Sequence, residues 1–369
     1  MKTNELLKKL ISFQTNQAKY DNGIKDFILK LFGNSDKEIF NIKNTKGRAF
    51  ALKLKPRKSL EAKKTICFLC HLDTVNPSDG WKSDPYKALE KDGKIFGLGA
   101  SDMKGPIVSL LQALLKKDYN REVVLMFTSD EETSVKDVIN LQKILKIKDS
   151  LIIATEPAGR TINAGQKGIL ELKITTKGKS GHASTASTTK NKKESAIYKI
   201  TEIIEFIKKQ EQKLAKREDS KFGVSTVNFG KIEGGTAVNV IPDKCSLEIS
   251  YRLVPKIKPE KILTELKQKI KKIDKETKIE ILLLGKSFES KNELEIKKIR
   301  ELLESSLKQK VELTYGRIWS EIAEFQEGNN VCLVIGPGEK NSCHCANEFV
   351  YVKQLDVFTV FFEKLLNDF

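Results

Sequence analysis

The sequence predicts an α/β protein in which helices cover a mostly parallel central sheet and a smaller α+β domain is inserted into the chain. The chain has 369 residues, about twice the common size of a single domain. Toward both ends, short apolar runs alternate with amphipathic helical stretches, as they do when a sheet is buried on both faces. The middle of the chain has a different order of elements, which indicates the second domain.

The amino-terminal part of the chain alternates predicted helices and strands up to about Glu156. Apolar residues recur at helical spacing over 6–11 and again over 24–31. Four apolar runs are too short for helices and predict strands over 49–54, 65–70, 123–127 and 151–154. After Ser290 the alternation resumes, with a helix over 294–307, strands over 311–315 and 331–335, and a closing helix to Phe369.

The middle of the chain predicts an inserted domain of the split βαβ, or ferredoxin-like, type. Its elements are a strand over 169–176, a helix over 196–207, strands over 223–232 and 245–254, a helix over 262–270, and a strand over 278–284. This is the β-α-β-β-α-β order of that unit. We therefore expect one domain from residues 1–167 and 286–369 and an inserted domain from residues 168–285.

The formal net charge of +17 raises the question of nucleic-acid binding. Only eight of the 66 basic residues are arginines, the side chain on which nucleic-acid recognition relies most. The lysines are scattered as on solvated helix faces, for example over 261–272. No apolar run approaches the roughly 20 residues of a membrane-spanning helix, and the first 13 residues lack the apolar block of a signal peptide. We expect a cytoplasmic protein that binds neither nucleic acid nor membrane.

The chain has six cysteines, too few for a disulfide scaffold in a protein of this length. Cys67 and Cys70 have C-x-x-C spacing, but they lie within an apolar run, so a strand core is a better interpretation than a redox pair. Cys343 and Cys345 flank His344. Adjacent residues cannot easily all face one ion, so we expect His344 alone to serve as a metal ligand.

Histidines and carboxylates follow the predicted strands at the points where these strands end. His71 and Asp73 follow the run over 65–70, and Glu131 and Glu132 follow the run over 123–127. Glu156 follows the run over 151–154, His344 lies beyond the run over 331–335, and Asp102 ends a glycine-rich turn. Ligands of open parallel sheets bind at the carboxyl ends of the strands. Such a cluster would repel itself without a cation, and mixed His/Asp/Glu ligation suits zinc or another divalent transition metal.

The sequence resembles a family of zinc aminoacyl hydrolases that includes acetylornithine deacetylase, succinyl-diaminopimelate desuccinylase and glutamate carboxypeptidase. The resemblance spans nearly the whole chain and keeps the order of the family's motifs. The matching stretches are 71–75 (HLDTV), 81–85 (WKSDP), 97–105 (GLGASDMKG), 129–134 (SDEETS), 156–157 (EP), 180–184 (SGHAS), 234–242 (GGTAVNVIP), 336–338 (GPG) and 344–348 (HCANE). The resemblance implies a zinc-peptidase-like catalytic domain and an inserted domain that serves as a lid and in dimerisation.

The resemblance also implies a role for each candidate residue. Two zinc ions, replaceable by cobalt, would lie about 3.5 Å apart. Asp102 would bridge them, with His71 and Glu156 on one ion and Glu132 and His344 on the other. Asp73 would orient the His71 imidazole, and Glu131 would be the general base that moves a proton from a metal-activated water to the leaving amine.

Three residues of the inserted domain complete the set that the resemblance implies. His182 would stabilise the oxyanion in the site of the partner subunit of a homodimer, although a lid histidine that only caps a turn remains an alternative. Asn239 and Arg252 would bind the carboxylate and acyl groups of the substrate, and the planar guanidinium of Arg252 suits a carboxylate.

The expected substrate is a small N-acyl amino acid, and three local features favour acetylornithine deacetylase: 97–99 (GLG), 130–134 (DEETS) and 335–338 (IGPG). The segment 319–325 contains Glu321 and Glu324 and no arginine, where desuccinylases carry one. An acidic loop favours a cationic amine such as that of ornithine. A desuccinylase or a related dipeptidase or carboxypeptidase remains the alternative.

Overall fold

The computed structural model describes residues 1–16, 18–33, 35–42, 48–56, 64–116, 119–186, 194–316 and 319–369. The chain forms two compact units, which are residues 1–165 with 289–369, and residues 166–288. The sequence places the inserted domain at 168–285. The observed boundaries differ from these by two and three residues. They fall within two short strands that pair with each other, β9 (Gly165–Gln166) and β16 (Phe288–Glu289).

The first unit contains an eight-stranded sheet with the order β1-β2-β6-β3-β7-β18-β8-β17. Its strands are β1 (Lys37–Asn41), β2 (Phe50–Leu54), β3 (Ile66–His71), β6 (Val123–Thr128), β7 (Leu151–Ala154), β8 (Thr161–Asn163), β17 (Glu312–Thr314) and β18 (Val331–Val334). The central run β6-β3-β7-β18 is parallel throughout. A second, three-stranded sheet joins β4 (Leu89–Lys91), β5 (Lys94–Phe96) and β19 (Phe349–Tyr351). The predicted α/β class with a mostly parallel sheet is confirmed.

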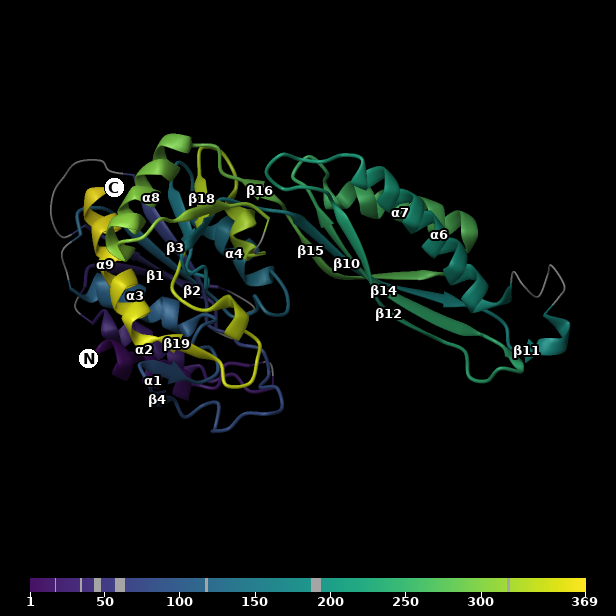
Figure 1. The fold of residues 1–369 in the computed structure, drawn as a ribbon, viewed down its shortest axis with the longest axis horizontal. Coiled ribbons are helices and arrows are strands. Elements are labelled where there is room, and N and C mark those ends of the chain that lie inside the picture. Colours follow the sequence, from purple (N-terminus) through teal and green to yellow (C-terminus); the bar gives the residue numbers. More distant parts are fainter. Residues whose placement is uncertain are drawn as a thin grey trace. The chain divides into compact units, whose positions relative to one another are not determined.

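Both faces of the central sheet are buried. One hydrophobic core joins alternate strand residues, such as Phe68 on β3 and Leu125 on β6, to the helices of one layer. These helices are α1 (Thr3–Ser12), α2 (Gly23–Leu31), α3 (Lys104–Leu115), α8 (Glu293–Leu307) and α9 (Val352–Asp368) (Figure 1). The opposite face carries the other strand residues, such as Cys67 and Met126. There, α4 (Lys136–Leu145) and the 3₁₀ helix η2 (Glu321–Phe325) contact the strands. Burial on both faces explains why these strands are continuous apolar runs.

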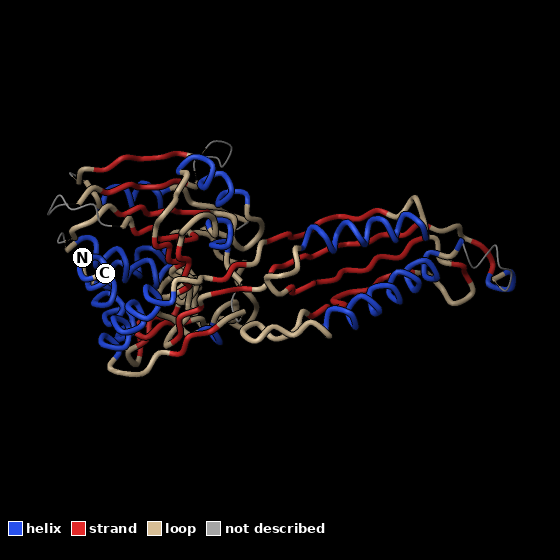
Figure 2. Tube along the Cα trace, turned by 90° about the horizontal axis from the view of Figure 1, so that it is seen from above, coloured by secondary structure: helices blue, strands red, loops and turns tan. Residues whose placement is uncertain are grey.

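The second unit has the predicted β-α-β-β-α-β order. Its main elements are β10 (Gly168–Lys177), α6 (Ala196–Ala215), β12 (Thr226–Gly234), β14 (Lys244–Leu253), α7 (Pro259–Ile273) and β15 (Lys278–Gly285). The strands form an antiparallel sheet with the order β12-β14-β10-β15. Both helices lie on one face of this sheet (Figure 2). A pair of two-residue strands, β11 (Gly181–His182) and β13 (Val240–Ile241), lies beyond the end of this sheet at which β14 begins.

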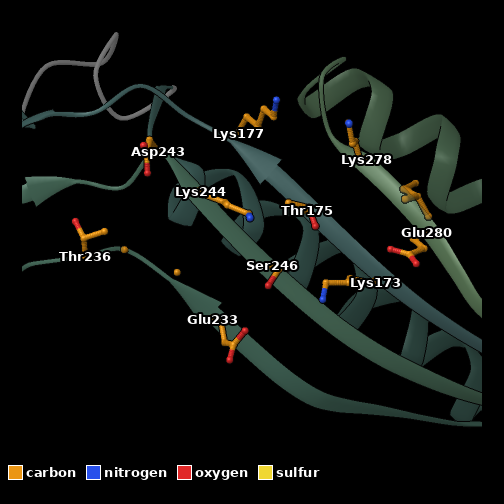
Figure 3. A pocket seen from close by; sticks show the side chains of 13 residues that line it. Lys173, Thr175, Lys177, Glu233, Thr236, Asp243, Lys244, Ser246, Lys278 and Glu280 are labelled. Carbon is orange, nitrogen blue, oxygen red and sulfur yellow. The ribbon is translucent and has the colours of Figure 1, made fainter. Parts of the chain in front are cut away.

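The other face of this second sheet is polar. It contains a hollow of about 950 Å³, and Figure 3 shows lysines and carboxylates of all four strands around it. The charges alternate across neighbouring strands, as where Lys173 pairs with Glu248 at 3.0 Å. Such alternation is typical of a solvated sheet face rather than of a continuous basic surface. Among the described helices, none is long and apolar enough to cross a membrane.

The strand β1, at the edge of the large sheet, is not among the strands that the sequence predicts. Its residues Lys37–Asn41 are all partly or largely exposed. Edge strands of this kind are short and charged, so they lack the apolar run that marks the central strands.

Candidate metal centre

Neighbouring parallel strands deliver the candidate ligands to one edge of the large sheet. His71 is the last residue of β3, and Glu131 and Glu132 lie three and four residues after β6. Glu156 lies two residues after β7, and His344 follows β18. Because β6, β3, β7 and β18 are adjacent and parallel, their carboxyl ends meet on the same side. Asp102 arrives at this edge from the turn that precedes α3.

The structure brings the five predicted ligands into two groups that share Asp102. One group is His71, Asp102 and Glu156, and the other is Asp102, Glu132 and His344, with the ligand atoms of each group within 4.8 Å of one another. Asp102 Oδ1 lies 3.0 Å from His71 Nε2, and Asp102 Oδ2 lies 3.3 Å from His344 Nε2. The two carboxylate oxygens therefore face different groups, which is the arrangement that a bridging ligand requires.

The orientation of His71 suits metal binding through Nε2. Its Nδ1 lies 3.0 Å from the main-chain oxygen of Asp73. A carbonyl oxygen can only accept, so Nδ1 donates a hydrogen to it and Nε2 is the nitrogen that faces the ligand group. Nε2 faces Asp102 Oδ1 at 3.0 Å and Glu156 Oε2 at 3.7 Å. A metal ion at this position would displace the proton of Nε2 and bind the neutral imidazole.

Asp73 approaches His71 with its main-chain oxygen as well as with the carboxylate that was expected to orient the ring. The carboxylate Oδ1 lies 3.6 Å from His71 Nδ1, too far for a good hydrogen bond, whereas the main-chain oxygen is 0.6 Å closer. The other carboxylate oxygen accepts a hydrogen bond of 3.1 Å from the amide of Glu132. The Asp73 main chain thus orients His71, and its side chain positions the loop that carries Glu132.

The electrostatics of the cluster fit a site for cations. Hydrogen bonds to Asp102 and Glu132 raise the pKa of His344 to about 11, and burial raises the pKa of Glu131 well above its usual value. Burial also raises the pKa of Glu156. Several carboxylates thus share a confined space in which their ionised forms repel one another. Divalent cations held by a His/Asp/Glu donor set relieve that repulsion, so the residues present fit a pair of metal ions.

Glu131 lies beside the two groups without belonging to either. One of its oxygens lies within 4.8 Å of ligand atoms of His71 and Glu132, in a third combination of side chains. The side chain is only partly buried. This position is next to both histidine-containing groups, which suits a group that exchanges protons with the substrate.

The cysteines do not contribute to the cluster. Among the described residues, neither Cys343 nor Cys345 belongs to a group that could hold a metal ion. Cys343 donates to the main-chain oxygen of Glu339 at 3.5 Å, and Cys345 is exposed. Cys67 and Cys70 are both buried on β3, where burial raises the pKa of each thiol to about 12. Residues three apart on a strand point to opposite faces, so these two thiols cannot pair.

The second unit brings together two of its three candidate residues. β11 pairs with β13, so that His182 lies opposite Val240, and the amide of Ala183 donates to the main-chain oxygen of Asn239. His182 is exposed, and its Nδ1 accepts a hydrogen bond from the amide of Ser184. Nε2 therefore carries the hydrogen in the neutral ring and is free to donate it. Arg252 lies elsewhere, near the end of β14, with Nη2 3.5 Å from Glu171.

Most of the segment 319–325, expected to be an acidic loop, forms the 3₁₀ helix η2 (Glu321–Phe325). Glu321 and Glu324 are 2% and 7% exposed. Glu321 accepts a hydrogen bond of 2.6 Å from Thr128, at the end of β6. Burial raises the pKa of Glu321 well above its usual value, and Asp130 adds to the effect. Sequence reasoning missed this inward orientation, because the 3₁₀ helix is too short to show a periodic pattern.

Comparisons with known proteins agree with this geometry. The profile of peptidase family M20/M25/M40 matches residues 67–368. An acetylornithine deacetylase of Buchnera aphidicola subsp. Schizaphis graminum is 28% identical over 84% of this chain and 82% of that protein. A succinyl-diaminopimelate desuccinylase of Sulfurimonas denitrificans is 34% identical, but the match spans about half of each chain, 50% of this one and 51% of the relative.

The solved structures show the same fold. The M20 family metallo-carboxypeptidase Sso-CP2 from Sulfolobus solfataricus aligns with a TM-score of 0.82 at 19% identity, over 99% of this chain and 98% of that one. The family match covers most of the chain and includes every candidate ligand. The chain therefore belongs to peptidase family M20/M25/M40 and is a metal-dependent amidohydrolase.

Proposed function

We propose that this protein hydrolyses the amide bond of an N-acyl amino acid, with N-acetylornithine as the substrate and ornithine and acetate as the products. The observation that carries the proposal is the pair of ligand groups that share Asp102. This is the arrangement expected of a two-metal hydrolase. The acetylornithine deacetylase from Buchnera matches along most of both chains, which supports the choice of substrate.

The ligand groups would hold two zinc ions, with cobalt as a substitute. When bound, such ions polarise a carbonyl group and lower the pKa of an attacking water. His71, Glu156, Asp102, Glu132 and His344 would hold them. Glu131 would accept the proton of the attacking water and deliver it to the nitrogen of the leaving amine, because it lies next to His71 and Glu132 and belongs to neither of the two groups that share Asp102.

The geometry of the second unit supports a dimer in which two chains build each site. β11, which contains His182, lies beyond the end of the sheet at which β14 begins (Figure 1). Asn239 accepts a hydrogen bond from Ala183 beside it, and Arg252 is near the other end of β14. From Lys244 to Arg252 the strand rises about 26 Å, at roughly 3.3 Å per residue. One N-acyl amino acid is too short to contact both ends. If Arg252 binds the substrate carboxylate and His182 donates to the oxyanion, they must come from different subunits.

Succinyl-diaminopimelate desuccinylation is the second candidate, because the desuccinylase relative has the higher identity over its shorter match. Against it, the segment 319–325 contains no arginine for a second acidic tail. The two buried glutamates no longer argue for a cationic substrate, so this choice rests on the missing arginine and on the extent of the deacetylase match.

A side-by-side assay tests the proposal. The zinc-loaded protein is supplied with N-acetylornithine, N-succinyl-diaminopimelate and an unblocked dipeptide, and kcat/KM is compared. We expect N-acetylornithine to be preferred. A clear preference for the succinyl substrate would establish the desuccinylase instead, and turnover of the dipeptide alone would indicate a peptidase.

A further inference from the structure

The glycine-rich turn that carries Asp102 depends on a contact from a distant part of the chain. Gly99 has a φ of 80°, in the left-handed region that favours glycine. A Cβ there would lie 3.0 Å from the Thr74 side chain and 3.1 Å from that of Lys104. The turn is therefore tightly enclosed, and several of its amide groups point away from any helix or sheet partner. Buried amides of this kind require acceptors.

Glu348 supplies those acceptors. Its Oε2 accepts a hydrogen bond of 3.0 Å from the amide of Gly99. Its Oε1 accepts bonds of 2.7 Å from Ser101 and 2.9 Å from Asp102. The main-chain oxygen of Glu348 accepts a fourth bond of 3.0 Å from the amide of Gly97. The residue is 2% exposed, so these amide groups, rather than water, satisfy its carboxylate.

These bonds link the segments that bear two of the candidate ligands. Asp102 follows Ser101 directly, and His344 lies four residues before Glu348. Between them, Asn347 accepts a hydrogen bond of 2.9 Å from the amide of Lys82 and donates to the main-chain oxygen of Gly80. The carboxylate of Glu348 thus fixes the amide of the one residue whose side-chain oxygens face both ligand groups.

We propose that Glu348 is a positioning residue that holds Asp102 between the two ligand groups and so sets the affinity of both for metal ions. The proposal rests on the proposed two-metal site and adds to it a residue that touches neither substrate nor metal. Glu348 acts through the main chain of the turn. Partners of this kind, outside the ligands themselves, typically change metal affinity 10- to 100-fold when they are replaced.

Glu348→Gln is the most specific test, because it keeps the size of the side chain. The amide oxygen can still accept from Ser101 and Asp102, but the amide nitrogen must then face the N–H of Gly99, donor against donor. The purified protein is dialysed to remove metal. It is then titrated with Zn²⁺ in the presence of a competing chelator. We expect about 10- to 100-fold weaker binding, with the metal-free protein still folded and unfolding in one cooperative transition.

Glu339→Gln is the matched control. Its carboxylate lies in the same part of the chain and accepts from Gln354 at 3.0 Å, a bond that a glutamine oxygen can keep, and we expect wild-type zinc affinity. Zinc affinity of Glu348→Gln within twofold of wild type would overturn the proposal. Failure of the metal-free Glu348→Gln variant to fold would also overturn it, because the carboxylate would then stabilise the whole unit and not the metal site alone. If the wild-type protein itself bound no zinc, that result would contradict the proposed two-metal function and not the role of Glu348.

Discussion

Replacing Asp73 separates two ways in which this residue can support the metal centre. The main-chain oxygen of Asp73 lies 3.0 Å from His71 Nδ1, and no side-chain change removes it. The carboxylate accepts from the amide of Glu132 at 3.1 Å. We therefore compare Asp73→Asn, which keeps an oxygen acceptor for that amide, with Asp73→Ala, which removes it.

The expected magnitudes follow from these contacts. A hydrogen bond to a charged group contributes about 1.5–3 kcal/mol and a neutral one about 1 kcal/mol. Asp73→Ala should therefore weaken zinc binding about 10- to 100-fold, because the Glu132 amide loses its partner. Asp73→Asn should lose only the charge contribution, about 1 kcal/mol or roughly fivefold. If the carboxylate itself held the His71 ring, Asp→Asn would be far more damaging, since such changes can lower kcat about 10⁴-fold.

The assay is zinc titration against a competing chelator, together with kcat for the preferred substrate, on both variants and the wild type. We expect the order wild type, Asp73→Asn, Asp73→Ala, with the asparagine variant close to wild type. Equal, severe losses in both variants would show that the negative charge beside His71 matters more than the bond to Glu132. The assignment of ring orientation to the main chain would then be wrong.

Three other predictions test different parts of the molecule. Glu131→Gln should keep zinc binding and lower kcat roughly 10²- to 10⁴-fold; near-wild-type kcat would exclude it as the general base. His182→Ala should lower kcat without changing the unfolding temperature, and mixing it with Glu131→Gln should restore part of the activity through hybrid dimers, whereas a complete lack of rescue would argue against a shared site. Phe362→Ala should lower the free energy of unfolding by about 3–5 kcal/mol in denaturant titrations, because the ring is fully buried and packs edge-on against Phe68, with centroids 5.6 Å apart; a loss below 1 kcal/mol would contradict this packing.

Much of the fold could be predicted because each buried strand had a distinct local signal. The run at 151–154 matches β7 without error, Glu156 follows β7 as predicted, and His71, predicted just after a strand, is the last residue of β3. Parallel strands share the direction of their carboxyl ends, so the meeting of these residues follows from the order of elements. The edge strand β1 lacked the signal, because its residues are exposed and polar.

Contacts between distant segments could not be predicted. Glu321 and Glu324 were expected in an acidic loop that contacts the substrate, yet both are buried, and Glu321 accepts a hydrogen bond from Thr128. Asp73 had the right spacing for its expected role, but the distances assign the contact with His71 to its main chain. Spacing along the chain shows which residues can approach one another. It does not show which atom makes the contact.

The sequence by itself determined the α/β class, the inserted domain, the family and the residues that follow the central strands, because periodicity and motifs are local properties of the chain. Only the tertiary structure decided that Asp102 presents one oxygen to each histidine and that Glu348 binds the turn from about 246 residues away. Those arrangements depend on the packing of segments that are separated in the sequence. Each such contact contributes only a small part of the free energy of folding, and it leaves no periodic pattern in the chain.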